Sequence, residues 1–199
     1  IGNSFYDNDE DILIDLSKSI NKEIKALVNL GCKYIQIDEP LFARKPDETC
    51  KYGIKYIEKC FEGVPEDITK IVHCCCGYPD KLDETDYPKA DVDCYKKISK
   101  VIDDSCVDML SIEDAHRHND YELFSMFKKT SIILGVVDIS SSKVETVESI
   151  KERIEEVGKY IPYSRLLIAP DCGMGMLSEE LIISKLTNMV EACNLINIC

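Results

Sequence analysis

Four residues of this sequence have the chemistry of zinc ligands, and each follows a short apolar segment: His73, Cys75, Glu113 and Cys172. Thiolate sulfur, imidazole nitrogen and carboxylate oxygen are the donors that zinc takes in proteins. One residue separates His73 from Cys75, so in an extended segment both side chains leave on the same side and could bind one ion. Singly, each has an ordinary explanation, because a buried cysteine is usually a small apolar residue. Together they predict one metal centre.

The same pattern holds at the end of every apolar run, where a carboxylate, an imidazole or a thiol follows. The carboxyl edge of a parallel sheet is where α/β proteins bind ligands and do chemistry. We therefore expect these side chains to meet, with Asp138 and Asp171 orienting the ligands. The five run ends are Asp38-Glu39-Pro40, His73-Cys74-Cys75-Cys76-Gly77, Glu113-Asp114, Asp138 and Asp171-Cys172-Gly173.

The runs themselves read as buried strands separated by amphipathic helices. Each is apolar on both faces, which is typical of parallel strands covered by helices. The alternation of strand and helix predicts a parallel α/β architecture. The expected strands are 33–37, 70–74, 107–112, 131–137 and 165–169, and the expected helices are 9–30, 91–104, 146–160 and 178–195, with another beginning near Asp120.

Five strands leave two architectures open. One is an open doubly wound sheet, and the other is the last five units of an eight-stranded barrel, for which about 250 residues are typical. No composition break divides residues 1–199, so we expect one domain. The first residues carry neither an initiator Met nor a basic-then-apolar signal pattern, and we expect an excerpt of a longer chain.

The composition and charge exclude some classes of binding partner. The formal charge of −13 argues against nucleic acid and anionic membranes, which bind clustered Lys and Arg. No apolar run approaches the roughly 20 residues of a membrane helix. Eleven cysteines, three of them consecutive at Cys74–Cys76, do not form the pattern of a disulfide-stapled domain. A reducing compartment, the cytoplasm, with some thiolates on a metal is the expectation.

Four motifs in this order resemble the C-terminal catalytic barrel of the cobalamin-independent methionine synthase family. They are Tyr34-Ile-Gln-Ile-Asp-Glu-Pro40, His73-x-Cys75, Ser111-Ile-Glu113 and Ala169-Pro-Asp-Cys-Gly173, and the resemblance covers nearly all of the chain. It implies a TIM (β/α)₈ barrel, of which this chain holds the last five βα units.

The resemblance also implies the roles of individual residues. His73, Cys75, Glu113 and Cys172 match the family's zinc ligands, and Asp38 matches the carboxylate that holds the amino group of homocysteine.

The activity that follows is zinc-dependent methylation of a thiol, with homocysteine converted to methionine in methionine biosynthesis. Methyltetrahydrofolate or a methylated corrinoid protein is the expected donor. We expect Glu113 and Asp138 to be catalytic, with Glu113 as the zinc ligand that loosens when the thiol arrives. Asp38, Glu39 and His116 are expected to bind substrate.

One position departs from the family pattern. The family's methionine synthases carry a proton-donating His shortly after the fourth strand, where this chain has Ser140. A hydroxyl is far too weak an acid to replace an imidazole. A corrinoid donor, or coenzyme M as the acceptor, therefore stays open. His116 and His118 could bind substrate or donor or shuttle protons, or could belong to an ordinary polar loop.

Two other classes of protein fit the sequence less well. A structural-zinc or redox-sensing domain built on Cys74–Cys76 would usually show paired C-x₂₋₄-C spacings in a small domain. A zinc-free barrel of the uroporphyrinogen decarboxylase branch would not need the complete His, Cys, Glu, Cys set. The sequence favours the methyltransferase.

Overall fold

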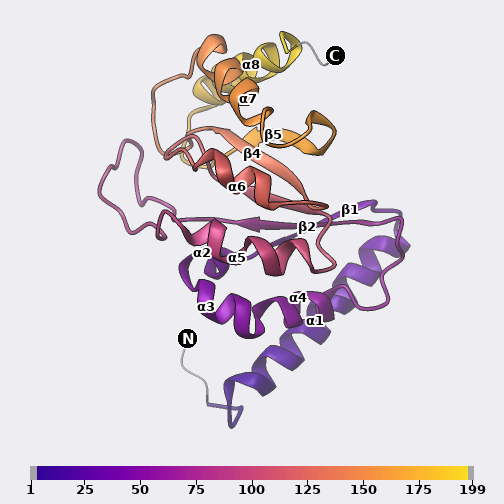
Figure 1. Ribbon diagram of the computed structural model, residues 1–199. Coiled ribbons are helices and arrows are strands. Elements are labelled where there is room, and N and C mark those ends of the chain that lie inside the picture. Colours follow the sequence, from indigo (N-terminus) through magenta and orange to yellow (C-terminus); the bar gives the residue numbers. More distant parts are fainter. Residues whose placement is uncertain (1–3, 197–199) are drawn as a thin grey trace.

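A five-stranded parallel sheet carries the polar run ends along one edge. The computed structural model describes residues 4–196 (Figure 1). All five predicted strands are confirmed, with ends that differ by two residues or fewer, and each pairs in parallel with its sequence neighbour. The strands are β1 (Tyr34–Asp38), β2 (Thr69–Cys74), β3 (Met109–Ile112), β4 (Ser131–Val137) and β5 (Leu166–Pro170).

The strand order decides between the two architectures that the sequence left open. The order is β1-β2-β3-β4-β5, without the reversal that defines a doubly wound sheet. Consecutive strands that lie side by side, each joined to the next by a helical connection, form an arc of a barrel. The prediction of a barrel segment is therefore confirmed.

The predicted helices are also present, and side chains cap three of them. Asn8 accepts a hydrogen bond from the Asp11 amide, while Thr146 and Ser178 begin their helices in the same way. Gly31 follows the first helix with a φ of 98°, which is the stop that the sequence indicated. These helices are α1 (Asp9–Asn29), α5 (Cys94–Asp103), α6 (Tyr121–Met126), α7 (Val147–Val157) and α8 (Glu179–Asn194).

Between β1 and β2 the chain forms further short helices that the sequence did not predict. Their apolar pattern is short and Pro46 interrupts it. The Asp-Glu-Pro motif starts the first of them, because the Glu39 carboxylate accepts from the Leu41 amide (3.1 Å) and Pro40 occupies the first turn. They are α2 (Pro40–Arg44), α3 (Pro46–Glu48), the π-helix η1 (Thr49–Gly53) and α4 (Ile54–Cys60); the 3₁₀ turn η2 (Tyr163–Arg165) precedes β5.

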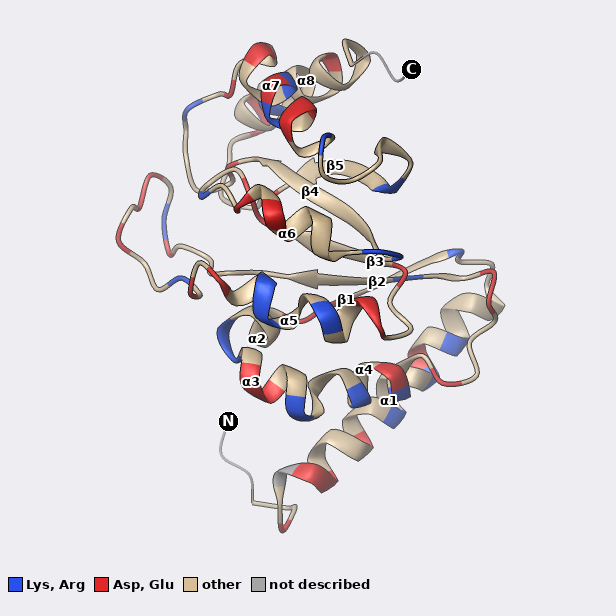
Figure 2. Cartoon of the chain, viewed as in Figure 1, with Lys and Arg blue, Asp and Glu red and all other residues tan. Residues whose placement is uncertain are grey.

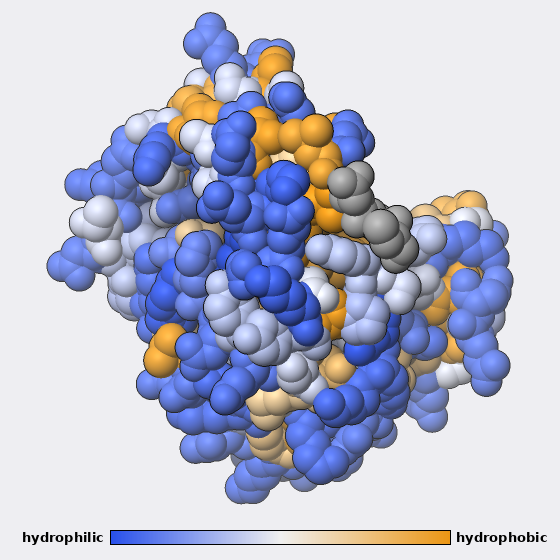
Figure 3. Space-filling view, turned by 45° about the horizontal axis from the view of Figure 1, so that its top comes forward, coloured by the Kyte–Doolittle hydropathy of each residue, from blue (hydrophilic) through white to orange (hydrophobic). Residues whose placement is uncertain are grey.

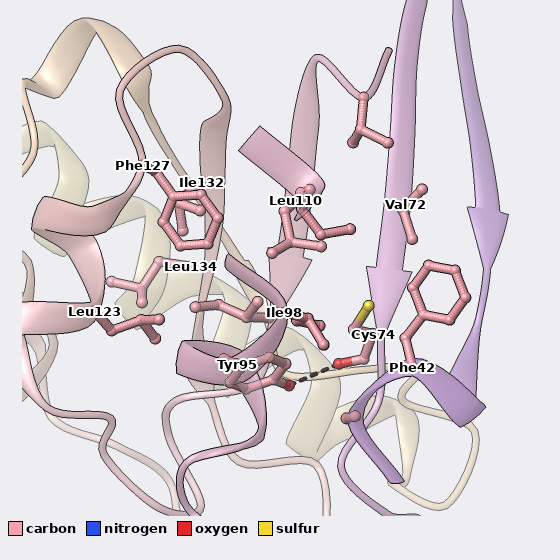
Figure 4. Packing of buried hydrophobic residues seen from close by; sticks show 14 of the residues in the cluster. Phe42, Val72, Cys74, Tyr95, Ile98, Leu110, Leu123, Phe127, Ile132 and Leu134 are labelled. Carbon is pink, nitrogen blue, oxygen red and sulfur yellow. Dashed lines mark hydrogen bonds between the residues drawn. The ribbon is translucent and has the colours of Figure 1, made fainter. Parts of the chain in front are cut away.

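Alternation along the strands separates the core from the site. Val72, Leu110 and Leu134 are fully buried and pack toward α5 and α6 (Figure 4). Cys74 also lies in this core. Residues one position away, such as His73, leave from the opposite face of the sheet. The helices therefore cover one face, and the chemistry-bearing side chains belong to the other.

The surface is strongly charged except beside α8. Lys, Arg, Asp and Glu lie mainly on the helices and loops, and the strands are nearly free of them (Figure 2). Apolar side chains gather in the upper part of the face shown in Figure 3, and Ile183 and Val190 of α8 and Leu195, which follows it, are each at least half exposed. No helix within residues 4–196 is both long and apolar enough to cross a membrane.

Asp103, at the end of α5, holds the segment that leads into β4. Its carboxylate accepts hydrogen bonds from the amides of Lys128 (2.9 Å), Lys129 (3.1 Å) and Thr130 (2.9 Å). Burial raises the pKa of Asp103, but these hydrogen bonds outweigh it and leave the pKa below its usual value of 3.8. The ionised carboxylate therefore stabilises the fold.

At neutral pH we expect Asp103→Asn to lower the free energy of unfolding by about 2 kcal/mol, because a neutral amide replaces a charged acceptor. A carboxyl group whose pKa falls on folding stabilises the protein above its unfolded pKa and loses that contribution as the pH drops through the folded pKa. The difference in the free energy of unfolding between the two proteins should therefore be largest at neutral pH and should shrink below pH 3.8. Urea denaturation of both proteins at neutral and acidic pH measures it. A difference independent of pH would contradict the assignment.

Candidate active site

Three of the four predicted metal ligands lie together on the face opposite the helices. His73 Nε2 is 3.0 Å from Cys75 Sγ, and Cys75 Sγ is 3.2 Å from Cys172 Sγ. All three donor atoms lie within 4.8 Å of one another. β2 and β5 are three strands apart, about 14 Å along a flat sheet. The curvature of a barrel segment, together with the loops that follow β2 and β5, brings these side chains close to one another.

The donor set suits zinc with one position open. Catalytic zinc sites use three protein ligands of this kind and leave the fourth position for water or substrate. A hydrogen bond from Cys75 and another from His73 lower the pKa of Cys172 to about 5, while the pKa of Cys75 is raised. The hydrogen bond between the two thiols therefore favours the thiolate at Cys172 over the thiolate at Cys75.

Ser111 orients the imidazole of His73. Its buried hydroxyl lies 2.8 Å from His73 Nδ1, and the two residues are register partners in β2 and β3. With Nδ1 occupied in this way, Nε2 is the nitrogen that faces Cys75. Sequence reasoning included Ser111 in a motif but gave it no role; strand register, which the sequence alone does not fix, was the missing information.

Removal of this hydroxyl should weaken metal binding without disturbing the fold. We expect Ser111→Ala to lower zinc affinity by roughly 10- to 100-fold, the range for partners that orient a ligating histidine. Ser111→Thr keeps the hydroxyl and should restore affinity. Competition with a chromophoric chelator measures it, with Ser99→Ala as a control because that buried hydroxyl bonds only within α5 and to Met126. Equal affinity in Ser111→Ala would rule out the orienting role.

Glu113, the fourth predicted ligand, lies beside this group but is not a member of it. Its carboxylate accepts a hydrogen bond from the Cys76 amide (3.0 Å), and its side chain is 98% buried. Burial, with negative charge at Cys76 and Asp171, raises the pKa of Glu113 to about 9. The structure places Glu113 next to the loop that carries Cys75, and its role as a ligand stays a prediction.

Tyr95 of α5 joins the strand ends that carry these residues. Its buried hydroxyl donates to the Cys74 carbonyl (2.6 Å, Figure 4) and accepts from the Glu113 amide (3.2 Å). Cys76 Sγ lies 3.2 Å from the same oxygen. Tyr95 therefore fixes the spacing of β2 and β3 at the edge where the site begins. Sequence reasoning missed it, because in the helix pattern it looks like any other core residue.

Asp171 shapes the loop after β3. Its buried carboxylate accepts four hydrogen bonds, from the amides of Asp114, Ala115 and His116 and from the His116 ring, each at 2.9 Å. The other ring nitrogen of His116, Nε2, is buried and has no partner among residues 4–196. These contacts order the loop of His116, so the prediction that Asp171 orients the metal ligands stays a prediction, and His116 is left with one unused polar atom.

The other histidine of this loop faces outward. The side chain of His118 is 61% exposed, and its Nδ1 lies 2.8 Å from the carbonyl of Asp114. Asp114 is fully buried, and Arg153 binds its two carboxylate oxygens at 2.6 and 2.8 Å. Of the two histidines, only His116 is enclosed within the loop.

Asp38 and Glu39 take different positions at the end of β1. Asp38 is the register partner of His73, and its exposed carboxylate accepts from Gln36 (2.8 Å). Glu39 caps α2 and lines a cavity of about 280 Å³ between α1 and the α2–α4 segment. Burial raises the pKa of Glu39. Asp38 is thus beside the metal-site histidine, while Glu39 is turned toward the helices.

The loop after β4 holds Asp138 and Ser140. One carboxylate oxygen of Asp138 accepts from both the amide (2.8 Å) and the hydroxyl (2.6 Å) of Ser140. Lys185, fully buried on α8, donates to the Asp138 carbonyl and to Glu145, which also accepts from the Asp138 amide. The hydroxyl that stands at the family's histidine position is therefore bound to Asp138.

Comparisons with known proteins agree with this geometry. The family model of the catalytic domain of cobalamin-independent synthases matches residues 1–195. The methionine synthase of Pyrococcus horikoshii is 32% identical over 195 residues, covering 98% of this chain and 52% of that protein. The methionine synthase of Saccharolobus solfataricus is 32% identical over 199 residues, covering 98% of this chain and 53% of that protein.

Solved structures give the same fold. A B12-independent methionine synthase from Shewanella sp. W3-18-1, in complex with selenomethionine, matches with a TM-score of 0.85 and 25% identity, over 96% of this chain and 56% of that one. A methyltransferase from Methanosarcina mazei shares the fold at 17% identity, with a TM-score of 0.63 over 89% of this chain and 46% of that one. The chain spans about half the length of the curated relatives it matches.

Proposed function

Because the chain belongs to the family of cobalamin-independent synthase catalytic domains, we propose that it is part of a zinc-dependent methyltransferase that converts homocysteine to methionine. One observation carries the proposal: His73, Cys75 and Cys172 converge within 4.8 Å across three strands. The Shewanella relative, whose structure contains selenomethionine, supports it, since that molecule is the selenium analogue of the proposed product.

We infer that zinc is the metal, held by His73, Cys75 and Cys172, with Glu113 as the proposed fourth donor. The two sulfurs and one imidazole fit zinc better than magnesium or calcium, which prefer oxygen. When bound, zinc would lower the pKa of the substrate thiol and so supply a thiolate at neutral pH. The chain's part is to hold the donors and to exclude water from the sulfur.

Carboxylates and one histidine would bind the rest of the substrate. Asp38, exposed beside His73, suits the ammonium group of an amino acid. Glu39 is proposed as a second substrate-binding carboxylate, and it would have to turn from its cap on α2 to reach that side. His116 would use its unpartnered Nε2 to hydrogen-bond substrate or donor, and Asp138 is proposed as a catalytic carboxylate in the loop after β4.

The transfer forms a sulfur–carbon bond and breaks the bond between methyl and donor, whose electron pair stays with the donor. A methyl group on the nitrogen of methyltetrahydrofolate leaves more easily when that nitrogen gains a proton. Ser140 cannot supply this proton, and its hydroxyl is bound to Asp138. A methylated corrinoid protein needs no proton for its leaving group. Both donors therefore belong in the test, as does coenzyme M as acceptor.

The experiment is a methyl-transfer assay with the full-length, zinc-loaded protein. L-homocysteine is offered with methyltetrahydrofolate or methylcobalamin, and coenzyme M replaces homocysteine in a parallel series. We expect methionine from at least one donor. If coenzyme M is methylated and homocysteine is not, the protein would instead be one of the related thiol alkyltransferases. Bound zinc with no product from any pair would favour a structural or redox-sensing role.

We also propose that residues 1–199 form the C-terminal part of one (β/α)₈ barrel. Among residues 4–196, β1 pairs only with β2 and β5 only with β4. Apolar side chains stay exposed near both edges, on α1 at Leu16 and on α8 at Ile183. Further strands of the same protein would pair with these edges and cover those side chains.

A further inference from the structure

The loop between β2 and α5 (75–93) reaches across the edge where the site lies. In Figure 1 it extends at the left, beside the loop that follows β4. The amide of Asp83 donates to the Ser140 carbonyl (2.7 Å), and the Ser142 amide donates to the Asp83 carboxylate (2.8 Å). β4 is two strands from β2 in the sheet order. The loop therefore passes the end of β3 to reach its anchor.

Within this loop, Tyr78 joins the two segments that carry the thiols. It follows Cys75 by three residues, and its hydroxyl donates to the carbonyl of Gly173 (2.9 Å), the residue after Cys172. The hydrogen bond therefore links the segment of Cys75 to the residue next to Cys172, although the side chain of Tyr78 is partly exposed to solvent.

The base of the loop leaves Tyr78 little freedom to move. The amide of Ala90 donates to the Cys76 carbonyl (2.8 Å), which ties the returning chain to the outgoing one. A Cβ on Gly77 would lie 2.3 Å from the Pro88 carbonyl oxygen, so the outgoing and returning segments of the loop are in contact there. Because Tyr78 extends from this packed base, its hydrogen bond to Gly173 fixes one thiol segment relative to the other.

We propose that Tyr78 is a positioning residue of the metal site, whose hydrogen bond to Gly173 holds Cys75 and Cys172 at the separation at which both sulfurs bind one ion. The proposal rests on the function proposed above and extends it. His73 and Cys75 come from one segment and need no such tie. Cys172 comes from another segment, 97 residues away, and its placement depends on contacts between loops.

The test measures zinc affinity in the full-length protein by competition with a chromophoric chelator, without substrate. We expect Tyr78→Phe to bind zinc about fivefold more weakly, the factor for one net hydrogen bond. Tyr78→Ala should lose about the same zinc affinity, because the hydroxyl and not the ring makes the hydrogen bond to Gly173. Thermal unfolding of the metal-free proteins is measured in parallel: the lost hydrogen bond should lower stability slightly, but only a positioning role also lowers zinc affinity, which a merely structural role would leave unchanged. Tyr34→Phe is the control; this tyrosine is 68% exposed at the opposite edge of the sheet.

The outcomes separate this inference from the proposed function. Zinc affinity in Tyr78→Phe equal to that of the unmodified protein would overturn the role of Tyr78 and leave the zinc site standing. An equal loss in Tyr34→Phe would also overturn it, because the effect would then not be local. An unmodified protein that binds no zinc would overturn both.

Discussion

We expect Cys172→Ser to bind zinc more than about 100-fold more weakly than the unmodified full-length protein and to show no measurable methyl transfer. Loss of a partner that only orients a ligand costs roughly 10- to 100-fold, so loss of a ligand should cost more. A serine hydroxyl keeps its proton at neutral pH, whereas the pKa of Cys172 is already lowered to about 5 by hydrogen bonds from Cys75 and His73. Zinc content after dialysis and methionine formation measure the two effects.

Cys50→Ser is the matched control for this substitution. Cys50 is exposed on η1, in contact with the Lys97 carbonyl, and is not one of the grouped donors. It should keep full zinc content and activity. Normal zinc affinity in Cys172→Ser would show that the ion, if any, lies elsewhere. Loss of zinc in both variants would indicate that thiol replacement acts through general destabilisation.

The second large effect is expected at Gly135, in the middle of β4. A Cβ at this position would lie 2.2 Å from a carboxylate oxygen of Asp171 and 2.7 Å from its Cα. The backbone of Asp171 cannot simply turn away, and its carboxylate accepts all four hydrogen bonds that shape the loop of His116. Gly135 is therefore required by close approach of another residue, not by its own backbone conformation.

We expect Gly135→Ala to lower the free energy of unfolding by about 3 kcal/mol, at the upper end for overpacking of a core. Urea denaturation measures this change, and zinc affinity should fall with it because Asp171 precedes Cys172. Gly175→Ala is the control, since a Cβ there meets no atom within 4 Å. Stability of Gly135→Ala equal to that of Gly175→Ala would refute the packing account.

The strands were predictable because buried parallel strands have a recognisable sequence pattern. Each is an apolar run, and each ends where the chain reaches the polar edge of the sheet. The short helices after β1 were not predictable in the same way. Their start depends on Glu39, whose carboxylate caps α2, and their apolar pattern is too short to show a period.

Part of the metal site was also predictable. The one-residue spacing of His73 and Cys75 indicates a shared side, and family resemblance adds Cys172. Ser111, Tyr95 and Tyr78 could not be assigned roles in advance, because their partners lie 18 to 95 residues away. Register and loop contacts decide those pairs, and neither has a local signature.

The most direct test of the account is zinc X-ray absorption of the full-length protein with and without L-homocysteine. The account predicts one zinc per chain with two sulfur neighbours and at least one nitrogen neighbour, from Cys75, Cys172 and His73, and one additional sulfur when homocysteine is present. A zinc environment that homocysteine leaves unchanged, or a protein purified without zinc, would contradict thiol activation at this site.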